Sequence, residues 1–148
     1  MTATAHAIIG GAIAASISDP VIGISLAFIS HPLMDIVPHW DLGIGWRQKS
    51  KIKLFTQATS DLVLGVIVAY LLFGHNVPLW YFLACVLASE SWDLAEIPYW
   101  FFRWNFAPWS WVYQFQHHIQ GKAGLPWGIV TQVAACGLIF LALQVYHF

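Results

Sequence analysis

Five long apolar segments follow one another along the chain, separated by short stretches that contain polar residues, glycine or proline. They cover residues 3–17, 21–37, 54–73, 79–97 and 125–146. A helix that spans a bilayer needs ~20 predominantly apolar residues, with a range of ~17–25, so this pattern predicts a bundle of membrane helices. The first two segments are short by that measure. Gly10, Gly11 and Gly23 would allow them to pack closely as a helical hairpin.

An aromatic stretch separates the fourth and fifth segments. Residues 99–113 are dense in Trp and Tyr, and Pro98 and Pro108 interrupt this part of the chain. Trp and Tyr are enriched at membrane–water interfaces, so we expect the stretch to lie along the membrane surface and not to cross it. The sequence therefore predicts an all-α, polytopic membrane bundle. It would form a single domain over residues 1–148, with about five transmembrane helices and one interfacial segment.

Composition supports the membrane class. The chain is 59% hydrophobic and only 9% charged, against roughly 25% charged residues in ordinary soluble proteins. A net charge of −1 and the lack of a basic stripe give no indication of nucleic-acid binding. Cys85 and Cys136 do not form a C-x-x-C pair, which excludes the usual redox and zinc-ribbon motifs. The first residues lack a basic stretch typical of signal peptides, so we expect the first segment to persist as a helix.

The basic residues predict the orientation. All of them fall between the second and third segments or between the fourth and fifth, which lie on the same side of a five-span bundle. They are Arg47, Lys49, Lys51, Lys53, Arg103 and Lys122. The positive-inside rule makes that side cytoplasmic, with the N-terminus inside and the C-terminus outside.

Ionisable residues gather at the same level of this topology. His31 and Asp35 are four residues apart near the end of the second segment, so they share one helix face. Such a pair is costly inside a membrane unless it is paired, hydrated or coordinated. Six of the seven acidic residues and five of the seven histidines reach the same membrane half. We therefore predict a shared metal site, with candidate ligands His6, His31, Asp35, His39, Asp61, Asp93, His117 and His118.

Imidazole and carboxylate ligands without a nearby thiolate favour zinc, with manganese or iron as alternatives. The number of candidate ligands allows one to three ions, and paired ions polarise phosphoryl groups and activate water. The candidate catalytic residues are Glu90, as general base, and Asp41. Two simpler interpretations stay open. His31 and Asp35 could form a plain buried pair between helices, and Asp61 could cap the third helix.

Several short motifs, in order along the chain, resemble a group of small bacterial inner-membrane proteins described as membrane-bound metal-dependent hydrolases. The motifs are His6, His31-Pro-Leu-Met-Asp35, Pro38-His39-Trp-Asp41, Asp61 and the pair Glu90 and Asp93. The H-x-x-x-D element is also similar to helical ligand pairs of zinc-dependent phospholipase C and P1-type nucleases, which are all-helical and hold three zinc ions. The resemblance implies a multi-pass protein of the bacterial inner membrane, in which His31 and Asp35 act as a ligand pair.

This chain lacks the H-x-x-x-E pair of the phospholipase pattern, so Glu90, Asp93 and His118 would have to substitute for it. We expect metal-dependent hydrolysis of a phosphoester or lipid-linked substrate that enters from the cytoplasmic leaflet. The alternatives are a metal-ion or proton transporter and a non-catalytic membrane protein with a structural metal. Buried acidic and histidine residues also mark ion pathways, but the opposite half of the predicted bundle offers few polar residues.

Overall fold

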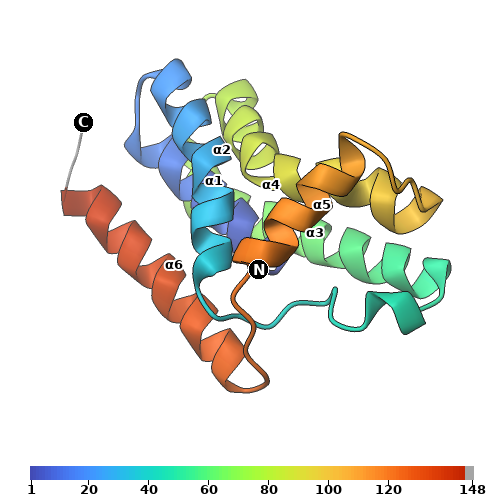
Figure 1. The fold of residues 1–148 in the computed structure, drawn as a ribbon. Helices are drawn as coiled ribbons and strands as arrows, with labels where there is room; N and C mark the ends of the chain where they lie inside the picture. Colours follow the sequence, from blue (N-terminus) through green and yellow to red (C-terminus); the bar gives the residue numbers. More distant parts are fainter. Residues whose placement is uncertain (146–148) are drawn as a thin grey trace.

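The computed structural model describes residues 1–145, and all of its regular elements are helices, joined by short connections, without a β-strand (Figure 1). Short 3-10 helices lie at Trp46–Gln48 and Gly74–Asn76. The α-helices are α1 (Ala3–Ser16), α2 (Pro20–Ile36), α3 (Lys51–Phe73), α4 (Leu79–Phe102), α5 (Trp109–Ile119) and α6 (Trp127–Val145). The predicted all-α class is confirmed. The five predicted segments correspond to α1, α2, α3, α4 and α6, although residue 146 of the fifth lies outside the described residues.

Polar residues define where three of these helices begin. The side chains of Thr2, Asp19 and Ser50 accept hydrogen bonds from backbone N–H groups in the first turns of α1, α2 and α3. These N–H groups have no partner within their own helix, so such caps stabilise the helix start by about 1 kcal/mol. Pro20 follows Asp19 at the first helical position, where its fixed φ suits the helix.

Helix α1 is the buried centre of the bundle, and α2, α3, α4 and α6 pack around it. Its small residues permit close approach of the neighbouring backbones. A Cβ atom added to Gly10 would lie 2.6 Å from Ser89 Oγ in α4, and one added to Gly65 in α3 would lie 2.7 Å from Thr4 Cα in α1. The fold therefore depends on small residues where α1 meets α4 and α3.

Two helices, α3 and α6, are long and apolar enough to cross a membrane. The segments are Lys51–Asn76, with a mean hydropathy of 1.6, and Trp127–Gln144, with 1.7. Only 17% and 11% of their most apolar windows are buried inside the protein, so their apolar side chains mostly face outward. α1 and α2 are shorter apolar helices. The five-span arrangement thus stays a prediction.

The aromatic stretch is divided between two helices. Residues 99–102 continue α4, residues 103–108 form a turn, and α5 follows with 11 residues, packed against α4 (Figure 1). A helix of that length is about 16 Å long, which is too short for the ~30 Å hydrocarbon core of a bilayer. α5 is therefore not a further span, but the sequence did not predict that it would be a helix.

Candidate metal site

A cavity of about 480 Å³ lies at the end of the bundle where the α2–α3 loop and α5 meet α3 and α4. Six of the seven acidic side chains line it: Asp35, Asp41, Asp61, Glu90, Asp93 and Glu96. The seventh, Asp19, is exposed and caps α2. The structure thus brings together the acidic residues that the sequence placed at one level of the bundle.

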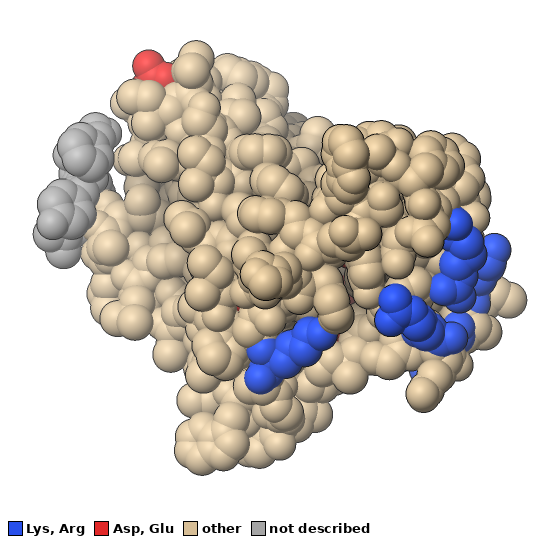
Figure 2. Space-filling view, in the orientation of Figure 1, with Lys and Arg blue, Asp and Glu red and all other residues tan. Residues whose placement is uncertain are grey.

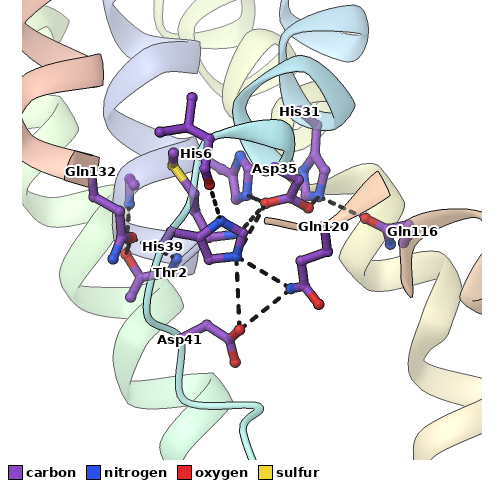
Figure 3. A network of polar contacts seen from close by, with 12 residues as sticks. Thr2, His6, His31, Asp35, His39, Asp41, Gln116, Gln120 and Gln132 are labelled. Atoms are coloured by element: carbon purple, nitrogen blue, oxygen red, sulfur yellow. Dashed lines mark hydrogen bonds and ion pairs between the residues drawn. The ribbon is translucent and has the colours of Figure 1, made fainter. Parts of the chain in front are cut away.

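Asp35 lies at the centre of a polar network (Figure 3). Its Oδ1 atom is 3.3 Å from His6 Nε2 and 3.8 Å from His39 Nε2, and its Oδ2 atom is 3.3 Å from His31 Nε2. The α-amino group of Met1 also contacts Oδ1. Asp35 is only 2% exposed. One buried carboxylate on α2 therefore gathers a histidine from α1, one from α2 and one from the following loop.

The ring of His31 is oriented by a backbone carbonyl. Its Nδ1 lies 2.5 Å from the Ser89 carbonyl oxygen. Because a carbonyl only accepts, Nδ1 carries the proton and donates it, and in the neutral ring Nε2 keeps its lone pair. Nε2 faces three oxygens: Gln116 Oε1 at 3.1 Å, Asp35 Oδ2 at 3.3 Å and Asp93 Oδ1 at 3.5 Å. Nε2 and these oxygens can be satisfied by a proton on Nε2 or by a metal ion between them.

Gln116 is itself oriented, because its Nε2 donates to Glu96 Oε1 at 2.9 Å. This hydrogen bond turns the amide oxygen toward His31, so a carboxylate outside the cluster fixes which atom faces the ring.

His39 repeats the arrangement of His31. Its Nδ1 lies 2.7 Å from the Val37 carbonyl oxygen, and its Nε2 lies 3.8 Å from Asp41 Oδ2 as well as from Asp35. Gln120 Nε2 lies 3.3 Å from both His39 Nε2 and Asp41 Oδ2. Burial, followed by the positive α-amino group nearby, lowers the pKa of His39. The neutral ring that binds metals is therefore favoured.

Three donor atoms are close enough to share one ion. One ligand atom each of His6, His31 and Asp93 lies within 4.8 Å of the others. The rings of His6 and His31 stack with their centroids 3.7 Å apart. Ligands at ~2.0–2.2 Å from a tetrahedral zinc lie ~3.4 Å from one another, so modest side-chain movements would close the site. His6 Nε2 is buried and lacks a partner with hydrogen-bond geometry, despite its proximity to Asp35.

Three of the predicted ligands lie outside the polar network around Asp35 and His31. Asp61 lines the cavity, but its carboxylate accepts hydrogen bonds from Ala3 N–H at 2.8 Å and from Thr4 Oγ1 at 2.6 Å. Asp61 therefore anchors the start of α1, and not the start of its own helix. The His118 side chain is exposed and forms no hydrogen bond or ion pair within residues 1–145. His117 is exposed and stacks on Tyr113; its pKa is lowered by partial burial and then by Lys122.

The two predicted catalytic residues both line the cavity. Glu90 is 3% exposed, and its Oε1 has no hydrogen-bond partner. Asp41 contacts His39 and Gln120. Sequence reasoning did not foresee the orienting carbonyls of Ser89 and Val37, because a backbone acceptor has no signal in the sequence. It also did not foresee that basic and aromatic residues of the α2–α3 loop, among them Arg47 and Trp46, line the same cavity.

No protein-family model matches the chain, and comparisons with curated proteins and with solved structures give no similar protein. The resemblance to membrane-bound metal-dependent hydrolases therefore stays a prediction.

Proposed function

We propose that this protein is a membrane-embedded, metal-dependent hydrolase whose ion is held by His6, His31 and Asp93, with Asp35 at its side. The observation that carries the proposal is the position of His31 Nε2. The Ser89 carbonyl accepts the proton of Nδ1, and Nε2 points at oxygens of Asp35, Asp93 and Gln116. This is the orientation in which a histidine binds a metal ion, with its second ring nitrogen donating to a backbone oxygen.

The available donors fit a divalent ion. Imidazole nitrogens and carboxylate oxygens suit zinc, manganese or iron, and zinc agrees best with a small set of mixed nitrogen and oxygen ligands. His6 Nε2 and Glu90 Oε1 are buried without hydrogen-bond partners, which costs about 1–3 kcal/mol for each group unless a ligand satisfies it. When bound, a divalent ion supplies Lewis acidity toward a phosphoryl oxygen and activates water at neutral pH.

Glu90 has the position expected of a general base. It lies on α4 one turn before Asp93, lines the cavity and has an unpaired carboxylate oxygen. Glu90 takes a proton from the attacking water and can return it to the leaving group. Asp41, held by Gln120 next to His39, is the second candidate for this role.

The membrane location is supported by the outward-facing apolar surface of α3 and α6. A core helix of a soluble protein of similar hydropathy would be mostly buried, whereas these windows are 17% and 11% buried. All basic residues lie in the α2–α3 region, at the end of α4 or just after α5. By the positive-inside rule we place that end of the bundle, and with it the cavity, on the cytoplasmic side.

Hydrolysis of a phosphodiester such as bis(p-nitrophenyl) phosphate by purified protein tests the function. We expect a chelator to abolish turnover and added Zn²⁺ to restore it. Glu90→Gln should lower turnover about 100-fold or more, the typical contribution of a general base, while metal content is unchanged. Asp19→Asn, which changes the exposed acid outside the cavity, serves as the control. Turnover that ignores the chelator, or equal turnover in Glu90→Gln, would refute the mechanism.

A structural metal is the second candidate function. The three donor residues His6, His31 and Asp93 lie on α1, α2 and α4, so one ion would tie three helices together. In that case chelation would lower the thermal unfolding midpoint, and no phosphoester would be turned over. A structural site has a complete set of protein ligands, whereas a catalytic site keeps a position open to water or substrate.

A further inference from the structure

The rim of the cavity carries two cationic side chains, while its floor is acidic. Arg47 and Lys122 line the cavity and are exposed, whereas Asp35, Glu90 and Glu96 line it and are buried. Within residues 1–145, no Lys or Arg side chain forms an ion pair with a carboxylate. In Figure 2, basic side chains gather at the end of the molecule where the α2–α3 loop and α5 lie. The rim charges are therefore available to a ligand.

Aromatic residues position Arg47. Its guanidinium carbon lies 4.9 Å from the ring centroid of Trp46, and its Nη2 donates to the Tyr113 hydroxyl at 3.3 Å. The Trp46 ring is itself stacked on Trp100, with a centroid separation of 5.6 Å and an interplanar angle of 5°. A guanidinium supported on an aromatic face keeps other N–H donors free, and their planar geometry suits the oxygens of a phosphate.

Lys122 is positioned by the backbone next to the candidate metal ligands. His39 N–H donates to the Gly121 carbonyl at 3.2 Å, and Ala123 N–H donates to the His39 carbonyl at 2.9 Å. The segment that carries Lys122 thus pairs with the segment that carries His39. This pairing holds the ammonium-bearing residue at the cavity rim beside the buried site.

One wall of the cavity is apolar and lies toward the side of the bundle. Leu54 and Leu62 of α3 and Leu94, Ile97 and Phe101 of α4 line it. α3 and α4 both pack on α1, and they meet each other through side chains, such as the rings of Phe55 and Phe101, whose centroids are 6.4 Å apart. Ile97 is 40% exposed. Because Ile97 in this wall is partly exposed, we infer that the apolar wall continues toward the outward-facing surface of α3, where we expect lipid.

We propose that the cavity binds a phosphate-bearing amphiphile, with the phosphate at Arg47 and Lys122 and the acyl chain along the wall formed by α3 and α4. The amphiphile would be the substrate class of the proposed hydrolase. Its reaction rests on that proposed function, whereas its binding does not. Six carboxylates in the lining would repel an anion, so cations at the rim and an ion at the floor are needed to attract it. Gln57 and Trp100 also line the cavity. The Gln57 Oε1 and Trp100 Nε1 atoms are buried without hydrogen-bond partners, so they offer an acceptor and a donor to the headgroup.

The test is calorimetric binding of dioctanoyl phosphatidic acid to metal-loaded protein in detergent, beside inorganic phosphate and neutral dioctanoylglycerol. We expect phosphatidic acid to bind at least about 10-fold more tightly than either comparison ligand, because only it engages rim and wall together. Arg47→Gln and Lys122→Gln should each weaken binding about 10-fold, the effect of one lost charge-assisted contact. Lys51→Gln, an exposed basic residue that does not line the cavity, is the matched control.

Equal affinity for phosphatidic acid and inorganic phosphate would overturn the amphiphile assignment. An equal loss in Lys51→Gln would also overturn it, because general surface charge would then explain the binding. Metal content measured on the same preparations separates the two proposals. Metal-loaded protein without a preference for phosphatidic acid refutes this inference alone. Protein that never holds metal but binds phosphatidic acid through Arg47 refutes the hydrolase and supports the inference.

Discussion

Asp35 is the residue that most members of the polar network contact. The orientation of His31 is the feature of this network that favours metal binding. Both are buried, and each would be costly to bury alone. Together with His6 and Asp93 they form a group in which every facing atom can donate an electron pair to a cation. A proton could satisfy one such contact, but a divalent ion satisfies several at once.

Replacement of His31 and of His118 should have different effects on metal affinity. His31→Gln removes an imidazole from the cluster, so we expect metal affinity to fall by more than about 10-fold. His118→Gln changes an exposed histidine outside the cluster and should leave affinity unchanged. Competition with a chromophoric chelator measures both. A comparable loss in His118→Gln would identify His118 as a ligand and contradict the three-residue ligand set.

Residue patterns could predict much of this site, because ionisable side chains in apolar helices are rare and their depth follows from helix length. That reasoning places His6, His31, Asp35, His39 and Asp93 at one level, where the structure also finds them. It could not distinguish His118 from a ligand, since side-chain direction at the end of α5 depends on how α5 packs. It could not show that Asp61 serves a neighbouring helix, because that contact joins positions 58 residues apart.

At the scale of elements, α1 is the helix on which the others are assembled, and it is fixed at its start and along its length. Asp61 of α3 receives hydrogen bonds from Ala3 and Thr4 at the start of α1. Further along, Gly10 lies against the backbone of α4. These contacts place His6 beside α2 and α4, so the position of the proposed metal site depends on them.

Loss of the Asp61 carboxylate should destabilise the fold and spare the metal. Asp61→Ala leaves the first N–H groups of α1 without their acceptor, which we expect to lower the free energy of unfolding by about 1–3 kcal/mol. Metal content of the folded protein should stay at the wild-type level. Thermal unfolding in detergent and metal analysis check the two effects. Unchanged stability together with lost metal would identify Asp61 as a ligand.

Replacement by alanine should affect stability differently at Gly10 and at Gly137. Gly10→Ala places a Cβ 2.6 Å from Ser89 Oγ and 2.9 Å from the Cys85 carbonyl oxygen, so we expect a destabilisation of about 1–3 kcal/mol. Gly137→Ala lies in α6 with no atom within 4 Å of the new Cβ, and it should be neutral or stabilise by up to about 1 kcal/mol. Thermal unfolding in the same detergent compares them. Equal effects would contradict the close packing of α1 on α4.

Five of the helices could be predicted because each is a continuous apolar segment bounded by Pro, Gly or polar residues. α5 could not, because its 11 residues carry mixed aromatic and polar side chains and its sequence resembles a surface segment. The division of the aromatic stretch depends on the turn at residues 103–108, where Arg103 adopts a left-handed conformation with φ 61°. A non-glycine residue in that conformation is rare, and the sequence gives no signal for it.

At the scale of the whole molecule, the usual arrangement of charge and apolar surface is reversed. Most acidic side chains line an internal cavity, while apolar side chains of α3 and α6 face outward. This arrangement suits a protein whose surroundings are lipid and whose ligand enters a polar interior.

The outward apolar surface predicts that the protein remains in the membrane under conditions that release peripheral proteins. After an alkaline carbonate wash of membranes, we expect the chain in the pellet, because α3 and α6 would expose their apolar windows to water on release. A peripheral membrane protein serves as the control for the wash. Recovery of folded protein in the supernatant would show that α3 and α6 do not cross the bilayer.

The metal content of mildly purified protein tests the central claim most directly. Elemental analysis should find at least one divalent ion per wild-type chain, and Asp35→Asn should lose most of it because the buried network loses its charge. Asp19→Asn is the matched control, and circular dichroism verifies that each variant is folded. Wild-type protein without stoichiometric metal, or folded Asp35→Asn with the full amount, would contradict a metal site at His6, His31 and Asp93.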